Sequence, residues 1–237
     1  MKQSNCNDQK LVLFDIDGTL IQGGHPILRQ SYLQAIKKVF GIEILVDWRK
    51  HDGSIDRKIF IDILKDQGIS EGQILGKLED LFEERYNYFY QNVEEDYRKR
   101  LIKPAKNLVV KLSKRGINLG LLTGNLPSVA RLKMEVTGLS TYFKFGLFGH
   151  EAEDRVSLAK EVFLKAKEFF GIKFLPENIY VIGDTVKDIE CGKSIKARTI
   201  GVATGFIASL GELKKAKPDL AVKTLADTKV FKFIFST

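Results

Sequence analysis

The sequence predicts an α/β fold: a Rossmann-like core with a parallel sheet and helices on both faces, plus an all-helical cap inserted after the first strand. Short apolar runs alternate with helical patterns from about residue 104 onward, which is typical of a parallel sheet. Residues 11–14 form an unbroken apolar run, as expected of a strand that is buried on both faces. Helical patterns alone fill residues 21–100.

Helices follow the opening strand. Apolar residues recur at helical spacing over residues 26–40, 55–64 and 71–92. Gly41 and Gly68 end the first two of these stretches. Because no strand pattern interrupts the region, we expect a core domain over residues 1–20 and 103–237 and a helical cap domain over residues 21–102.

From Pro104 onward, helices and strands alternate. We expect strands over residues 117–122, 145–148, 179–182, 198–202 and 218–222. We expect helices over residues 105–115, 154–170 and 187–194, and a further helix that begins at Pro127. The apolar spacing of 154–170 places Phe163 on the buried side of its helix. This alternation implies right-handed crossovers and one parallel sheet.

The composition narrows the class of protein. The chain has 237 residues, of which 44% are hydrophobic and 29% charged, which indicates a globular rather than a disordered protein. The first ten residues hold no apolar segment and no run reaches the length of a membrane span, so we expect no signal peptide and no membrane partner. Cys6 and Cys191 form no disulfide framework, which favours the cytoplasm and a structural role for Cys191.

The net charge is +8, but the lysines are spread along the expected helices. No arginine-rich arm or aromatic–basic ladder stands out, so we expect no nucleic-acid partner. A basic surface attracts small anionic substrates instead. We expect a monomer or a homodimer.

Small and acidic residues follow three of the expected strands. The acids are Asp15, Asp17, Asp184 and Asp188. The carboxyl ends of parallel strands lie along one edge of the sheet, so these side chains should gather around one point. Oxygen ligands without a His or Cys cluster favour Mg²⁺ over Zn²⁺. Taken singly, an Asp-Gly turn after the first strand and a helix N-cap at Asp184 explain the same residues.

The end of the strand expected over residues 117–122 suits a phosphate group. Thr123 lies at a strand-to-helix junction, together with the backbone amides of Gly124 and Asn125. A buried basic residue should complete such a cradle.

Three stretches in this order resemble the motifs of the haloacid dehalogenase superfamily of phosphohydrolases. They are DIDGTL at 15–20, LLTGN at 121–125 and GDTVKD at 183–188. The helical segment between the first and the second resembles the cap of the phosphoglycolate phosphatase-like branch. The resemblance covers about residues 11–20 and 104–205.

The resemblance implies roles for the matching residues. Asp15 is the nucleophile and forms an aspartyl-phosphate, while Asp17 is the acid that protonates the leaving oxygen and then the base that activates water. Thr123 and the Gly124 amide hold the phosphoryl group.

The resemblance to the superfamily also implies a Mg²⁺ site. The carboxylates of Asp15 and Asp184 and the carbonyl of Asp17 hold the ion, and Asp188 orients a water on it or binds it directly.

The sequence departs from the family at the third motif, where many relatives carry a lysine in a Lys-Pro setting. Arg155 is the better candidate for this phosphate-binding residue because it begins its helix just after an expected strand, and Lys160 is the alternative. A surface charge on the helix is another interpretation of Arg155.

The cap should select the substrate. Residues 52–57, DGSIDR, resemble the loop that caps of this family direct at the active site, which raises Asp56 as a candidate. Arg57 and His51 would then reach an anionic leaving group. A solvated turn before a capped helix explains the same residues.

The sequence therefore predicts a Mg²⁺-dependent phosphatase that hydrolyses a small phosphorylated metabolite through an aspartyl-phosphate. A sugar phosphomutase, a phosphonate hydrolase using Lys50 or Lys58, and a non-catalytic binding protein are the alternatives. A dehalogenase is disfavoured because a halide needs no proton from Asp17. A phosphorylated receiver domain would lack the helical insert.

Overall fold

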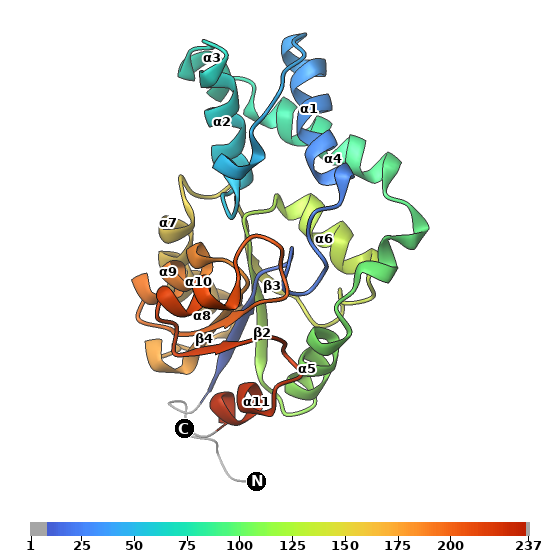
Figure 1. Cartoon of the computed structure of the whole chain (residues 1–237). Helices are drawn as coiled ribbons and strands as arrows, with labels where there is room; N and C mark the ends of the chain where they lie inside the picture. Colours follow the sequence, from blue (N-terminus) through green and yellow to red (C-terminus); the bar gives the residue numbers. More distant parts are fainter. Residues whose placement is uncertain (1–8, 236–237) are drawn as a thin grey trace.

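A computed structural model describes residues 9–235 and confirms the predicted fold class. Six parallel strands form one sheet in the order β3-β2-β1-β4-β5-β6 (Figure 1). The strands are β1 (Leu11–Phe14), β2 (Asn118–Leu122), β3 (Phe145–Leu147), β4 (Ile179–Gly183), β5 (Arg198–Val202) and β6 (Leu220–Val222). β1 lies in the middle, and the chain builds outward from it first on one side and then on the other. The carboxyl ends of β1 and β4 therefore flank the switch point at which open α/β sheets bind ligands.

The two faces of the sheet are covered by different helices because successive strand residues point to opposite faces. Val12 and Phe14 pack in the same cluster as residues of α5 (Lys103–Ser113), α6 (Pro127–Val136) and α11 (Thr228–Phe235). Leu11 and Leu13 pack with α7 (Arg155–Lys160), α8 (Val162–Phe170) and α9 (Val186–Ser194). α10 (Leu210–Lys215) packs against α9.

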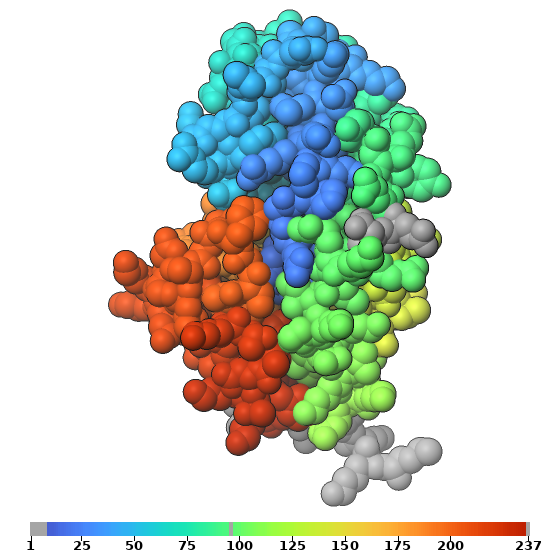
Figure 2. Space-filling view, turned by 45° about the vertical axis from the view of Figure 1, so that its right-hand side comes forward, coloured from blue at the N-terminus to red at the C-terminus, as the bar shows by residue number. Residues whose placement is uncertain are grey.

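A second lobe stands over the carboxyl ends of the strands (Figure 1), and Figure 2 shows it above the core. It contains α1 (Pro26–Phe40), the 3₁₀ helix η2 (Trp48–His51), α2 (Asp56–Asp66), α3 (Glu71–Leu75) and α4 (Leu78–Asn92). The lobe has its own core, in which Ile36, Phe60 and Leu81 are fully buried.

Two linkers join the lobes, one before α1 and one after α4. The linker after α4 passes through the 3₁₀ helix η3 (Glu95–Arg100), and a bridge pairs Ile21 of the first linker with Leu101 of the second. The Arg100 guanidinium donates to the carbonyls of Gln22 and Gly23, so the two linkers are bonded to each other.

Two predicted helices are wrong in their extent. Residues 71–92 form two helices because Gly76 has low helix propensity and the chain leaves the helical conformation at Lys77. Residues 154–170 also form two, separated at Glu161. The second helix buries Val162 and Ala166, so Phe163 is 36% exposed rather than buried as expected. The helices α10 and α11 and the short 3₁₀ helix η4 (Pro176–Asn178) were not predicted from the sequence.

Two further predictions concern the membrane and the cysteines. Within residues 9–235, none of the helices combines the length and the apolar character that a membrane span requires. Cys191 is fully buried, and burial raises the pKa of its thiol to about 12, as expected of a structural cysteine. Cys6 lies outside the described residues.

Candidate active site

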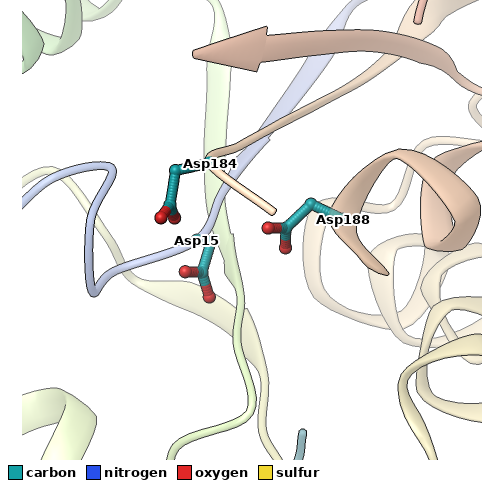
Figure 3. Close-up of side chains that lie close together, drawn as sticks. All are labelled: Asp15, Asp184 and Asp188. Atoms are coloured by element: carbon teal, nitrogen blue, oxygen red, sulfur yellow. The ribbon is translucent and has the colours of Figure 1, made fainter. Parts of the chain in front are cut away.

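Three carboxylates converge beyond the carboxyl ends of β1 and β4. Asp15 directly follows β1, Asp184 directly follows β4, and Asp188 lies in the first turn of α9. All three are buried, and their side chains lie close together (Figure 3). One oxygen from each lies within 4.8 Å of the others. The sheet therefore gathers the predicted acids, except that the side chain of Asp17 is not in this group.

Local structure fixes two of these acids. Asp184 accepts a hydrogen bond from the Thr19 hydroxyl at 3.1 Å. Gly18 has a φ of +89°, and a side chain there would collide with the Asp184 carboxylate, so glycine is required. Asp188 forms a capping box with Thr185, whose amide and hydroxyl donate to it at 3.0 and 2.6 Å.

Arg155 is a cation that bonds to two of the three acids. It begins α7, is buried, and donates to Asp15 at 3.0 Å and to Asp188 at 2.5 Å. Lys160, the alternative from the sequence, is exposed at the other end of the same helix. The structure therefore brings Arg155 into the site and leaves Lys160 outside it.

One guanidinium does not balance three carboxylates. Burial raises the pKa of Asp15 to about 7, and the charges of Asp188 and Asp17 add to the shift, while Arg155 opposes it. Burial, followed by the charges of Asp188 and Asp15, raises the pKa of Asp184 well above its usual range. A buried group of carboxylate oxygens with a deficit of positive charge has the chemistry of a Mg²⁺ site, so these residues fit the expected ion.

Asp17 has different surroundings although it lies only two residues after Asp15. Its Oδ2 accepts from the ammonium of Lys133 at 2.6 Å and from the side-chain amide of Asn125 at 2.8 Å. Burial would raise the pKa of Asp17, but the charge and hydrogen bond of Lys133, with help from Asn125, lower it. The positive charge that balances the Asp17 carboxylate is therefore supplied by the protein itself, through Lys133.

The loop after β2 holds the expected phosphate-binding residues. The Thr123 hydroxyl accepts from the side-chain amide of Asn125 at 2.9 Å. The cap rests on this loop, because the Asp56 amide donates to the Gly124 carbonyl at 2.8 Å and the Leu126 amide donates to the Asp56 carboxylate at 2.6 Å. No side chain fits on Gly124, where the Ser54 carbonyl approaches closely.

A cavity of about 160 Å³ lies between the two lobes and reaches Asp15, Asp17 and Asp184. Among the described residues, its lining from the cap includes Arg29, Tyr32, Trp48, His51, Asp56 and Arg85. Arg57, Lys50 and Lys58 are not in the lining, and the two lysines are exposed.

The Asp56 carboxylate serves the structure of the cap. It accepts from the Tyr32 hydroxyl and from Arg85 at 2.5 Å, in addition to the Leu126 amide. Arg85 also stacks over the Tyr32 ring, 4.2 Å from its centre. The Nε of Arg85 and the Nδ1 of His51 are buried without a hydrogen-bond partner in the structure.

Two further residues of the site, Lys133 and Arg85, were not predicted from the sequence. Both lie on the buried faces of amphipathic helices. Lys133 follows the buried Val129 by four residues, and Arg85 follows the buried Leu81 by four. A basic residue inside an apolar helical stripe was therefore the signal that marked them, because a buried cation requires a partner.

Comparison with known proteins agrees with this architecture. A family model described as haloacid dehalogenase-like hydrolase matches residues 9–196. The chain belongs to the haloacid dehalogenase-like hydrolase family. This confirms the resemblance stated from the three motifs and the prediction that the chain is an enzyme of this family.

Relatives within the family are similar over most of the chain. The phosphoglycolate phosphatase of Aquifex aeolicus is 25% identical over 229 residues, covering 94% of this chain and 100% of the relative. The phosphoserine phosphatase of Thermus thermophilus is 27% identical over 191 residues, covering 79% of this chain and 68% of the relative.

Solved structures share the fold. A β-phosphoglucomutase from Clostridium difficile superposes with a TM-score of 0.71 at 18% identity, covering 96% of this chain and 97% of the other. A predicted phosphatase from Clostridium acetobutylicum gives a TM-score of 0.70 at 20% identity and covers 97% and 99%. At such identities the likeness concerns the fold alone.

Proposed function

We propose that this member of the family is a Mg²⁺-dependent phosphatase that hydrolyses a small phosphorylated metabolite through an aspartyl-phosphate on Asp15. The convergence of Asp15, Asp184 and Asp188 in one buried group beside the cavity carries the proposal. The names of the two curated relatives, a phosphoglycolate phosphatase and a phosphoserine phosphatase, support the same reaction class.

The carboxylates of Asp15, Asp184 and Asp188 would hold the Mg²⁺ ion, with the Asp17 carbonyl as a further ligand. When bound, the ion supplies positive charge that neutralises the phosphoryl oxygens. Arg155 adds a second positive charge beside Asp15. Thr123 would donate its hydroxyl hydrogen to the phosphoryl group, since that oxygen already accepts from Asn125. Phosphoryl transfer requires mainly this positioning and charge neutralisation.

The two aspartates after β1 divide the chemistry. A carboxylate oxygen of Asp15 attacks phosphorus and the bond to the leaving oxygen breaks, while Asp17 gives that oxygen a proton. Water then attacks the aspartyl-phosphate, Asp17 takes the proton from the water, and Asp15 is released with inorganic phosphate. A phosphoryl group that enters beside Asp17 favours its protonated form, because like charges repel.

We also propose that residues 21–102 act as a mobile cap over a core of residues 1–20 and 103–237. The bonds between Asp56 and the backbone of residues 124 and 126 would join the cap to the phosphate loop in the closed state. Closure would exclude water from the reacting groups and place the leaving group among the cap residues of the cavity.

The test is phosphate release from a panel of small phosphorylated metabolites, with Mg²⁺ and with a chelator. We expect release that requires the metal and that falls by at least about 10⁴-fold in Asp15→Asn, because the nucleophile is lost. Asp66→Asn, at an exposed carboxylate of the cap, is the matched control. Undiminished release in Asp15→Asn would remove Asp15 from the role of nucleophile, and no release from any compound by the wild type would contradict the proposal.

A further inference from the structure

We infer that Lys133 is a positioning residue for the reaction: it holds the Asp17 carboxyl in place for proton transfer. This inference rests on the proposed function, which assigns the proton to Asp17. Lys133 is not part of any of the sequence motifs and lies on α6, a helix of the core that also packs against the cap helix α4.

The anchoring of Asp17 depends on few contacts. Among the side chains that the structure describes, the donors to its carboxylate are Lys133 and Asn125, and both bond to Oδ2. Oδ1 is buried and has no hydrogen-bond partner in the structure. The orientation of the whole carboxylate therefore depends on one oxygen and two donors.

Lys133 controls the second donor as well. Its ammonium donates to Oδ1 of Asn125 at 2.8 Å. This contact fixes which end of the amide is the donor, so that Nδ2 bonds to Asp17 at 2.8 Å and to the Thr123 hydroxyl at 2.9 Å. The Lys133 ammonium thus orients the Asp17 carboxylate directly. It also orients Asn125, whose side-chain amide bonds to both Asp17 and the Thr123 hydroxyl.

Packing does not require a lysine at this position. Lys133 is fully buried, and its neighbours Leu132 and Met134 belong to the apolar core beneath the sheet. The Phe89 ring of the cap lies 5.8 Å from its Nζ. An apolar side chain of similar length would suit such surroundings, whereas a buried ammonium is tolerated only with good partners. Lys133, Asn125 and Asp17 all border the cavity that reaches Asp15, so the cation is located where the proton must move.

The experiment compares Lys133→Met with the wild type on an alkyl phosphate from the panel and on p-nitrophenyl phosphate. An alkoxide leaves only with a proton, whereas p-nitrophenolate leaves without one. We expect kcat for the alkyl phosphate to fall about 100-fold, the scale of misplaced acid–base catalysis, with KM changed less than about threefold. With p-nitrophenyl phosphate we expect a burst of p-nitrophenol and accumulation of phosphoenzyme, because its hydrolysis still needs Asp17 as a base. Arg131→Met, an exposed charge on the same helix, is the control and should behave as the wild type.

A double variant separates positioning from a structural role. In the Asp17→Asn background, Lys133→Met should lower kcat by less than about threefold, because its effect passes through Asp17. Equal losses in both backgrounds, or loss on both substrates without a burst, would overturn the inference.

The remaining outcomes are also decisive. Failure of both Lys133→Met and the double variant to fold, judged by circular dichroism, would assign Lys133 a structural role and overturn the inference. If the wild type releases p-nitrophenol and Lys133→Met matches it on both substrates, the inference alone fails. If the wild type releases phosphate neither from any compound of the panel nor from p-nitrophenyl phosphate, the proposed function fails and the inference fails with it.

Discussion

Asp15 and Asp17 are two residues apart on the same strand end, yet their surroundings differ in charge. Asp15 shares its site with Asp184 and Asp188, and Arg155 is the one cation among the described residues that bonds to this group. Asp17 is paired with the ammonium of Lys133. The pKa of Asp15 is raised to about 7, whereas the pKa of Asp17 is lowered.

The difference shows which charges the protein supplies and which it leaves to a ligand. Under the proposed function, Mg²⁺ would supply the further positive charge beside the group of three acids, because it suits their oxygen ligands. The Asp17–Lys133 pair is complete within the protein. In the proposed mechanism, a nucleophile that needs a metal would therefore lie next to a proton carrier that does not.

The largest effect on the acidic group should come from its arginine. We expect Arg155→Ala to lower kcat/KM on the order of 100-fold, because it removes the cation that contacts Asp15 and Asp188 and would balance the phosphoryl charge. Lys160→Ala, on the same helix but exposed, should cost less than about twofold. Steady-state kinetics on one phosphate ester measures both, and the reverse order would transfer the phosphate contact to Lys160.

A smaller effect should follow from loss of one proposed ligand. Asp184→Asn should raise the Mg²⁺ concentration for half-maximal activity at least about 10-fold, because an amide oxygen is a weaker ligand than a carboxylate. Glu190→Gln changes an exposed acid in the middle of α9 and serves as the control. A metal titration with unchanged half-saturation in Asp184→Asn would refute the ligand assignment.

The smallest effect concerns stability. The pKa of Asp15 is raised from 3.8 to about 7, so the folded metal-free protein binds this proton more tightly than the unfolded chain does. The Asp15 contribution to the free energy of unfolding therefore decreases as the pH rises from about 4 through about 7. Mg²⁺ must displace that proton at pH values near 5 but not near 8.

We accordingly expect Mg²⁺ to raise Tm more near pH 8 than near pH 5, by about 2–4 °C for each kcal/mol of binding free energy. Thermal unfolding with Mg²⁺ and with chelator at the two pH values measures the effect. Ca²⁺ tests whether the site prefers the smaller ion, and an equal Mg²⁺ shift at both pH values would argue against a site built on Asp15.

The sequence was a better guide to the strands of the core than to the helices of either lobe. The strands of the core are short and mostly apolar runs, and they lie within one or two residues of their predicted positions. In the cap, the helix α1 has the predicted bounds, but the break at Gly76 was missed. Apolar spacing continues across such a break, so periodicity alone does not reveal where a helix changes direction.

Prediction of the site residues from the sequence is limited in the same way, because local patterns do not reveal contacts between remote residues. Asp15, Asp184 and Asp188 were predicted to converge because each follows a strand end, and the order of the sheet then brings them together. Lys133 pairs with a residue 116 positions away, and Arg85 with one 29 positions away. No local pattern names such a partner.

By itself, the sequence determined the parallel sheet, the helical insert and the acids at the strand ends, because these depend on local periodicity and on residue type. Only the tertiary structure decided that Arg155 rather than Lys160 faces Asp15, that Asp56 bonds to the phosphate loop, and that Lys133 pairs with Asp17. The physical reason is that charges buried together are stable only with partners at bonding distance, and distance between remote residues is a property of the folded chain.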